Sequence, residues 1–158
     1  MSFSPLITFH IALGELTGLA ALWIIVEMLE KPSVSRLNRA LAASLILAVA
    51  AWLSYLVGGY YYVTSYGPVK AVIKEGPWSW AHGIFMEVKE HIFLVGPYIA
   101  VALLSLVYAF RQEIAEIKEL RKTLIILLAA LFVGVAVILG FGVMVSTGYR
   151  VALATGGM

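Results

Sequence analysis

Four long apolar stretches, separated by short polar segments, make up most of the sequence. They cover about residues 5–28, 41–63, 80–110 and 123–148. A helix needs roughly 20 consecutive apolar residues to cross the hydrocarbon core of a bilayer, so each stretch predicts one transmembrane helix. A helix also satisfies its own backbone hydrogen bonds, as a membrane interior requires. The pattern therefore predicts an all-α protein, a four-helix transmembrane bundle that forms a single domain over residues 1–158.

Glycine and proline indicate where these helices end or bend. Gly67-Pro68 and Gly76-Pro77 predict turns, so we expect residues 64–79 to form an outer loop with a short helix on the membrane surface. Pro97 is expected to kink the third helix, because proline cannot donate a backbone hydrogen bond. The segment 111–122 places apolar residues at helical spacing between charges, which predicts a short amphipathic connector.

Composition excludes a soluble globular protein. Of the 158 residues, 62% are hydrophobic and 13% are charged, and the mean hydropathy is +0.97. Basic residues concentrate in two of the three connections, from Lys31 to Arg39 and from Arg111 to Lys122. The positive-inside rule places these two connections in the cytoplasm, which makes the chain N-out and C-out. We expect an integral protein of a prokaryotic plasma or inner membrane, in contact with the lipid bilayer and with no nucleic-acid partner.

The three histidines are the most informative polar residues. His10 lies inside the first apolar stretch, and His82 and His91 bracket a charged run at the start of the third. An ionisable side chain at membrane depth is costly, so each is a functional-site hypothesis. The chain has no cysteine, which excludes thiolate metal sites and iron–sulfur clusters. Imidazoles alone suit haem, zinc, copper or non-haem iron, and a b-type haem needs only one or two of them and a flat space.

His10 stands above a ladder of small residues on one face of the first helix, which includes Gly14, Thr17 and Ala21. Such a ladder has two interpretations. Small residues allow another helix to pack closely, or they leave space for a flat cofactor. The histidine at the top of the ladder favours the cofactor.

Counting residues up from the basic connections places His10 and His91 at the same height, about 30 Å above the cytoplasmic ends. Gly59 and Gly142 fall at this level on the other two helices. Two imidazoles that face each other across a space cleared by glycines are what a haem clamped between helices requires. Counting down from the outer end instead pairs His10 with His82. The sequence leaves both pairings open, so all three histidines are candidate iron ligands.

Three carboxylates are candidates for catalytic proton transfer. Glu15 lies in the middle of a span, where it could pass a proton beside a quinol or hydrogen-bond a neighbouring helix. Glu87 and Glu90 lie among two histidines and Lys89, and could tune a haem through hydrogen bonds. The alternative is that residues 80–90 stand clear of the membrane and that these charges, Lys89 above all, are simply solvated.

Parts of the first and third helices follow a familiar order of residues. FHIALGELTGLAALWIIVE carries histidine, then glycine, then glutamate, and Glu90 is followed by Phe93-Leu94. In this order the chain resembles the N-terminal helices of the main subunit of cytochrome bd quinol oxidases. The resemblance implies a haem ligand at His10, a second at His82 and a proton-handling carboxylate at Glu90. It covers only two helices: histidine replaces the family's glutamate at position 82, and the family's long quinol-binding loop is missing.

Together these features predict a small b-type membrane cytochrome. It binds haem b through His10 and either His91 or His82, and it transfers electrons between a membrane quinol and an outer-side or subunit partner. A quinone and other subunits, or further copies of the chain, are the expected partners of this quinol-linked oxidoreductase or oxidoreductase subunit. Two alternatives remain: a metal-ion or proton transporter that uses intramembrane His and Glu side chains, and a structural anchor subunit of a respiratory complex.

Overall fold

The computed structural model describes residues 4–156, which are helical apart from short turns and contain no strand. In chain order the elements are α1 (Pro5–Met28), α2 (Val34–Glu75), the π-helical turn η1 (Ala81–Met86), α3 (Glu87–Phe93), α4 (Val95–Ala109), α5 (Arg111–Glu116) and α6 (Lys118–Ala154). Four segments are long and apolar enough to cross a membrane: α1, α2, the run from η1 to α4, and α6. The all-α class and the four spanning helices are therefore confirmed.

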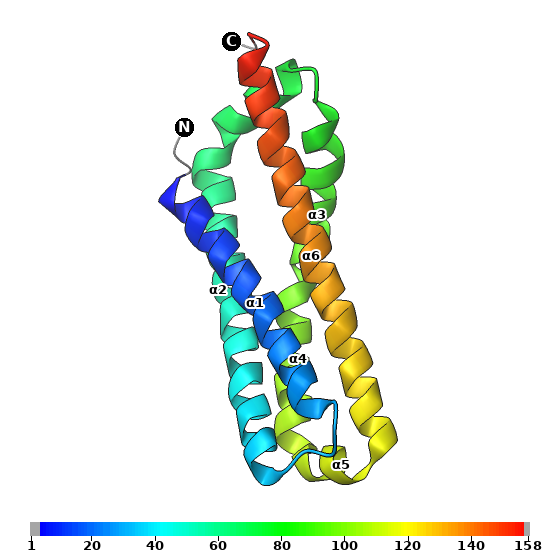
Figure 1. Cartoon of the computed structure of the whole chain (residues 1–158). Helices are drawn as coiled ribbons and strands as arrows, with labels where there is room; N and C mark the ends of the chain where they lie inside the picture. Colours follow the sequence, from blue (N-terminus) through cyan, green and yellow to red (C-terminus); the bar gives the residue numbers. More distant parts are fainter. Residues whose placement is uncertain (1–3, 157–158) are drawn as a thin grey trace.

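The four spans lie side by side as an elongated bundle (Figure 1). α1 begins and α6 ends at one end of the bundle, which we call the termini end. The α1–α2 connection and α5 lie at the opposite end, which we call the loop end. The largest contact is between α1 and α2, and α1 also packs on α6 while α2 packs on α4.

α2 is much longer than the apolar pattern predicts. The expected outer loop at residues 64–79 is wrong, because the helix continues through Gly67-Pro68 and ends at Glu75. Pro68 removes only the hydrogen bond to the carbonyl four residues earlier. Packing compensates for that loss, since Tyr66 and Ile73 are buried against η1 and α6. Only the second pair, Gly76-Pro77, ends the helix.

The third span is interrupted where proline predicts it. α3 ends at Phe93 and α4 begins at Val95. Pro97 has no N–H to donate to the carbonyl of residue 93, so the helical ladder is broken at this point. The span also begins with a π-helical turn over Ala81–Met86, a local widening that often occurs at functional sites. The periodicity of the sequence gives no sign of this turn.

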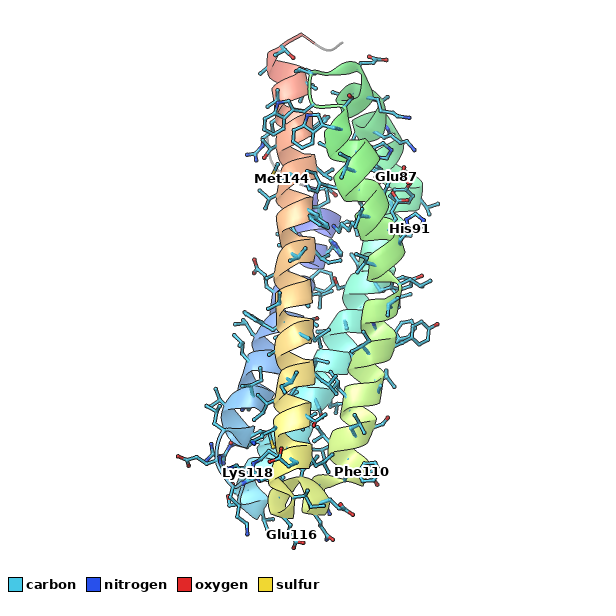
Figure 2. The ribbon with its side chains drawn as sticks, turned by 90° about the vertical axis from the view of Figure 1, so that its right-hand side faces the viewer. Glu87, His91, Phe110, Glu116, Lys118 and Met144 are labelled. Atoms are coloured by element: carbon cyan, nitrogen blue, oxygen red, sulfur yellow. The ribbon has the colours of Figure 1, made fainter. Side chains whose placement is uncertain are left out.

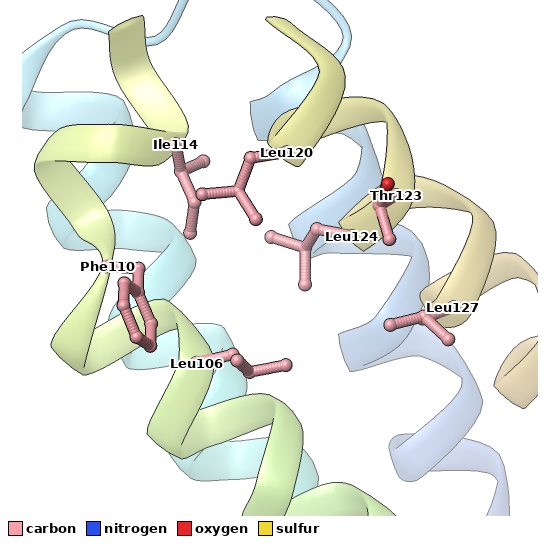
Figure 3. A pocket seen from close by; sticks show the side chains of 7 residues that line it. All are labelled: Leu106, Phe110, Ile114, Leu120, Thr123, Leu124 and Leu127. Carbon is pink, nitrogen blue, oxygen red and sulfur yellow. The ribbon is translucent and has the colours of Figure 1, made fainter. Parts of the chain in front are cut away.

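The apolar core fills the loop-end half of the bundle. Ile24 and Met28 of α1, Leu47 of α2 and Leu128 of α6 are fully buried there. The connector α5 anchors this end, because Ile114 is also buried in the same cluster. A small pocket opens beside it, and its lining is apolar except for one threonine (Figure 3): Leu106, Phe110, Ile114, Leu120, Thr123, Leu124 and Leu127.

One buried carboxylate fastens α1 to α2 at the loop end. Glu27 accepts hydrogen bonds from Arg39 at 2.8 and 2.9 Å, from Arg36 at 3.3 Å and from Trp23 at 3.2 Å. Arg36 also bonds the carbonyl of Val26 at 2.8 Å. The guanidinium groups of Arg36 and Arg39, at the start of α2, thus close the helical hairpin.

We predict that Glu27→Gln lowers the midpoint of thermal unfolding in detergent micelles by several degrees, because two arginines lose their shared buried partner. The matched control is Glu30→Gln. Glu30 contacts only Arg36 and its side chain is 82% exposed, so its loss changes the midpoint little. Equal shifts for the two variants would show that burial of Glu27 does not stabilise the hairpin.

Candidate functional site

A second group of polar side chains, besides the Glu27 network at the loop end, lies in the termini-end half of the bundle. They come from α1, α2, η1 and α3, and they meet where α2 extends beyond the apolar core. The group consists of His10, Ser54, Tyr62, Tyr66, His82, Glu87, Lys89 and Glu90. We call it the polar cluster.

His10 is tied to α2 by hydrogen bonds to Ser54. Its Nδ1 lies 2.9 Å from the Ser54 carbonyl oxygen and 3.1 Å from Ser54 Oγ, while Ser54 Oγ donates to the His10 carbonyl at 3.2 Å. A carbonyl oxygen can only accept, so Nδ1 carries the hydrogen. In the neutral ring the lone pair is then on Nε2. This is the tautomer of most histidines that ligate a metal through Nε2.

The glycine next to His10 makes room for the imidazole itself. A Cβ on Gly58 would lie 2.7 Å from two ring atoms of His10. A Cβ on Gly59, one residue further, would meet nothing within 4 Å. The space that we expected glycines to clear for a porphyrin is thus occupied at Gly58 by the histidine ring.

The small face of α1 packs against other helices. A Cβ on Gly14 would lie 3.4 Å from Leu139 of α6, and one on Gly18 would lie 3.5 Å from Val135 of the same helix. Close helix packing is therefore the role these small residues have in the structure. Gly142 differs, because its nearest neighbour would be Lys89 Nζ at 3.6 Å.

His82 is fully buried and both of its ring nitrogens are engaged. Nδ1 lies 3.1 Å from the hydroxyl of Tyr66, and Nε2 lies 3.5 Å from Glu87 Oε1. The distance from Nε2 to Glu87 is that of an ion pair when the ring is protonated, and the Tyr66 hydroxyl can donate to Nδ1 or accept from it. His82 in the π-helical turn thus links α2 to α3.

His91 has the same tautomer as His10 but a different environment. Its Nδ1 lies 2.6 Å from the carbonyl oxygen of Glu87, one turn earlier in α3, and the residue is exposed. Glu87 and His91 lie on the side of α3 that is turned away from α6 and Met144 (Figure 2). His10 instead lies against Ser54 and Gly58 of α2. The pairing of His10 with His91 that equal heights predicted stays a prediction.

The carboxylates also separate into different environments. Glu15 is exposed on α1, and Glu87 is half-exposed beside His82. Glu90 turns toward Tyr62 of α2, and its Oε1 is buried without a hydrogen-bond partner. A buried polar atom of this kind calls for an explanation such as water, an ion or a proton. Of the three candidates, Glu90 is the one that the fold places in the interior.

Lys89 is the residue that sequence reasoning missed. We expected it to be solvated, but it is partly buried, and its Nζ lies 3.6 Å from the place that a Cβ on Gly142 of α6 would take. The sequence signal for a partly buried Lys89 is helical spacing. Lys89 lies seven residues after His82, which is about two turns, and therefore on the same face of a regular helix.

The donor groups limit what metal chemistry is possible. Among residues 4–156, no three His, Cys, Asp or Glu side chains are grouped as a bound metal ion would need. A haem requires only one or two protein ligands, and the tautomers of His10 and His91 suit that role. Neither of the two apolar pockets includes a histidine: one lies at the loop end, and the other is lined by Leu13, Leu16, Leu45, Ile46, Val49, Ala50 and Leu53.

Fold and composition together define an α-helical membrane protein. We find no match to the chain among protein-family models, curated proteins or solved structures. Any more specific function therefore depends on the chemistry of the polar cluster.

We predict that Gly58→Ala destabilises the protein by about 1–3 kcal/mol, because the new methyl group would overlap the His10 ring. The matched control is Gly59→Ala, where the space is open and alanine favours the helix by about 1 kcal/mol. Unfolding by sodium dodecyl sulfate in mixed micelles measures both. A Gly58→Ala variant as stable as Gly59→Ala would contradict the packing of His10 on α2.

Proposed function

We propose that the protein is a membrane cytochrome that binds haem b at His10 and passes electrons between a membrane quinol and an outer-side or subunit partner. The observation that carries the proposal is the hydrogen bond from His10 Nδ1 to the Ser54 carbonyl at 2.9 Å. This bond fixes the orientation of the ring and places the lone pair of the neutral imidazole on Nε2, the nitrogen through which many histidines ligate a metal.

Each residue of the site has a defined role in this proposal. His10 holds the iron, and Ser54 orients the imidazole from α2. The haem supplies one-electron chemistry. Glu90, Glu87 and Glu15 are the carboxylates that take the protons of a quinol, and Glu90 has a buried carboxylate oxygen.

Partner subunits form part of the proposal. His91 and Glu15 are exposed on helices that span the membrane, and polar groups that face lipid are costly. Other subunits or further copies of the chain cover them. His91, with its Nε2 lone pair directed by the Glu87 carbonyl, then serves a group that is shared across such an interface.

The proposed orientation places both termini outside, in a prokaryotic plasma membrane. Its support is the charge distribution, because basic side chains gather at the loop end. Lys31, Arg36 and Arg39 follow α1, and Arg111, Lys118, Arg121 and Lys122 surround the start of α6. Under the positive-inside rule this end faces the cytoplasm.

The two rival functions make different demands. A metal-ion or proton transporter needs polar groups along the whole span, yet the loop-end half is filled by an apolar core that includes Ile24, Leu47 and Leu128. A structural anchor subunit needs no cofactor at all. It predicts that His10 variants alter assembly or stability without any change in an absorption spectrum.

We predict that the purified protein, expressed with added haem precursor, gives a b-type Soret band and reduced-minus-oxidised difference spectrum. His10→Ala should lose most of the haem, because it removes the ligand. Ser54→Ala keeps the backbone carbonyl that accepts from His10 Nδ1 and removes only the hydroxyl, so it should retain the haem. His82→Gln is the matched control, and it should keep the spectrum.

Two results would contradict the proposal. One is a wild-type protein without a Soret band after haem supplementation. The other is a haem spectrum that His10→Ala leaves unchanged while His82→Gln removes it.

A further inference from the structure

A carboxylate and an imidazole one helical turn apart reach the surface of α3. Glu87 and His91 lie on the side of the helix that is turned away from α6 and Met144 (Figure 2). The Nδ1 of His91 lies 2.6 Å from the backbone carbonyl oxygen of Glu87. A carbonyl oxygen only accepts, so Nδ1 carries the hydrogen and the neutral ring has its lone pair on Nε2. That nitrogen is the one through which such a ring binds a metal ion.

The Glu87 carboxylate has a partner on its inner side and is open on its outer side. Its Oε1 lies 3.5 Å from Nε2 of the buried His82, and 46% of the side chain is exposed. Side chains at i and i+4 of a helix are neighbours, with about 5–6 Å between their Cβ atoms, so one ion can bind both. Imidazole nitrogen and carboxylate oxygen are both zinc ligands, and a ligand held by a neighbouring group is typical of metal sites.

Alone, these two residues are half of a metal site. Zinc in a structural site is bound by four ligands in a tetrahedron. Among residues 4–156, no group of three or more His, Cys, Asp or Glu side chains is placed to hold a metal ion. The ligands that complete the site must therefore come from outside the chain.

A second copy of the chain offers the same two ligands at the same height. Copies inserted in one membrane share one orientation, so a two-fold axis along the membrane normal brings each residue to the level of its counterpart. The face around the pair is open to such an approach. Gly83 is exposed, and a Cβ on it would meet nothing within 4 Å. Val88 and Val95, three residues before His91 and four after it, are exposed apolar residues on its side of the helix.

Charge determines what can join the two copies. Two Glu87 carboxylates brought together repel each other, and the repulsion is strong beside a bilayer of low dielectric constant. A divalent cation bound between them cancels both charges and accepts the two imidazole lone pairs as well. The rise from Arg111 to His91 is about 30 Å, so the pair lies near the edge of the hydrocarbon core, where an ion can enter from water.

We propose that Glu87 and His91 form half of a zinc site, which the same two residues of a second copy complete. Zinc, or a divalent transition-metal ion of similar chemistry, then joins two chains through α3. The site is separate from His10 and binds its ion with or without haem. It takes from the proposed function only the expectation that further copies cover His91.

The test is native mass spectrometry of the purified chain, produced without a histidine tag, treated with EDTA and then titrated with Zn²⁺ in micelles. We expect monomers without zinc, and a dimer that carries one zinc ion when zinc is added. His91→Ala and Glu87→Gln each remove a ligand from both copies. Each should weaken zinc-dependent dimerisation by more than about 100-fold, since loss of a group that only orients a ligand already costs about 10–100-fold. Glu30→Gln, the matched control, removes an exposed carboxylate at the loop end and should dimerise like the wild type.

A wild-type chain that stays monomeric at all zinc concentrations would overturn the proposal. So would a dimer that persists in EDTA and in both variants, or equal losses in His91→Ala and Glu30→Gln. Zinc bound to each monomer would show that water completes the site and would overturn the role of the second copy. If Glu87→Gln fails to fold because His82 loses its partner, the exposed His91→Ala decides alone. His10→Ala separates this inference from the haem proposal, because it should lose the haem and keep the zinc-bound dimer.

Discussion

The absence of water from the membrane interior is the constraint on which this structure depends. A polar side chain there must find its partner within the protein. The loop-end half of the bundle meets the constraint with apolar side chains, and its one buried carboxylate, Glu27, is held by two arginines at the surface. The termini-end half meets it differently. There, His10 is hydrogen-bonded to Ser54, and His82 is hydrogen-bonded to Tyr66 and lies at ion-pair distance from Glu87.

These hydrogen bonds give chemically similar residues different roles. A histidine whose Nδ1 donates to a carbonyl carries the lone pair of the neutral ring on Nε2. His10 and His91 are of this kind, whereas the buried His82 lies between Tyr66 and Glu87. The proposal of haem binding at His10 uses this difference. Lys89 and Glu90 are neighbours in sequence, but Lys89 approaches Gly142 of α6 and Glu90 lies near Tyr62 of α2.

The sequence predicts the spans and the interruption near Pro97 because both follow from local rules of hydrophobic length and proline geometry. It does not predict that α2 continues through Gly67-Pro68, since the burial of Tyr66 and Ile73 against distant helices outweighs a local turn signal. The same limit applies to the site. Counting residues gave His10 and His91 equal height, but height does not specify the face of a helix that packs inward. The partners of His10 and His82 lie 44 and 16 residues away in sequence.

The tautomers of His10 and His91 test the central claim most directly, and nitrogen-15 NMR of histidine-labelled protein in micelles measures them without any cofactor. Hydrogen on Nδ1 of both residues is the predicted result. Hydrogen on Nε2 of His10 would contradict the bond to the Ser54 carbonyl, and with it the assignment of His10 as the ligand.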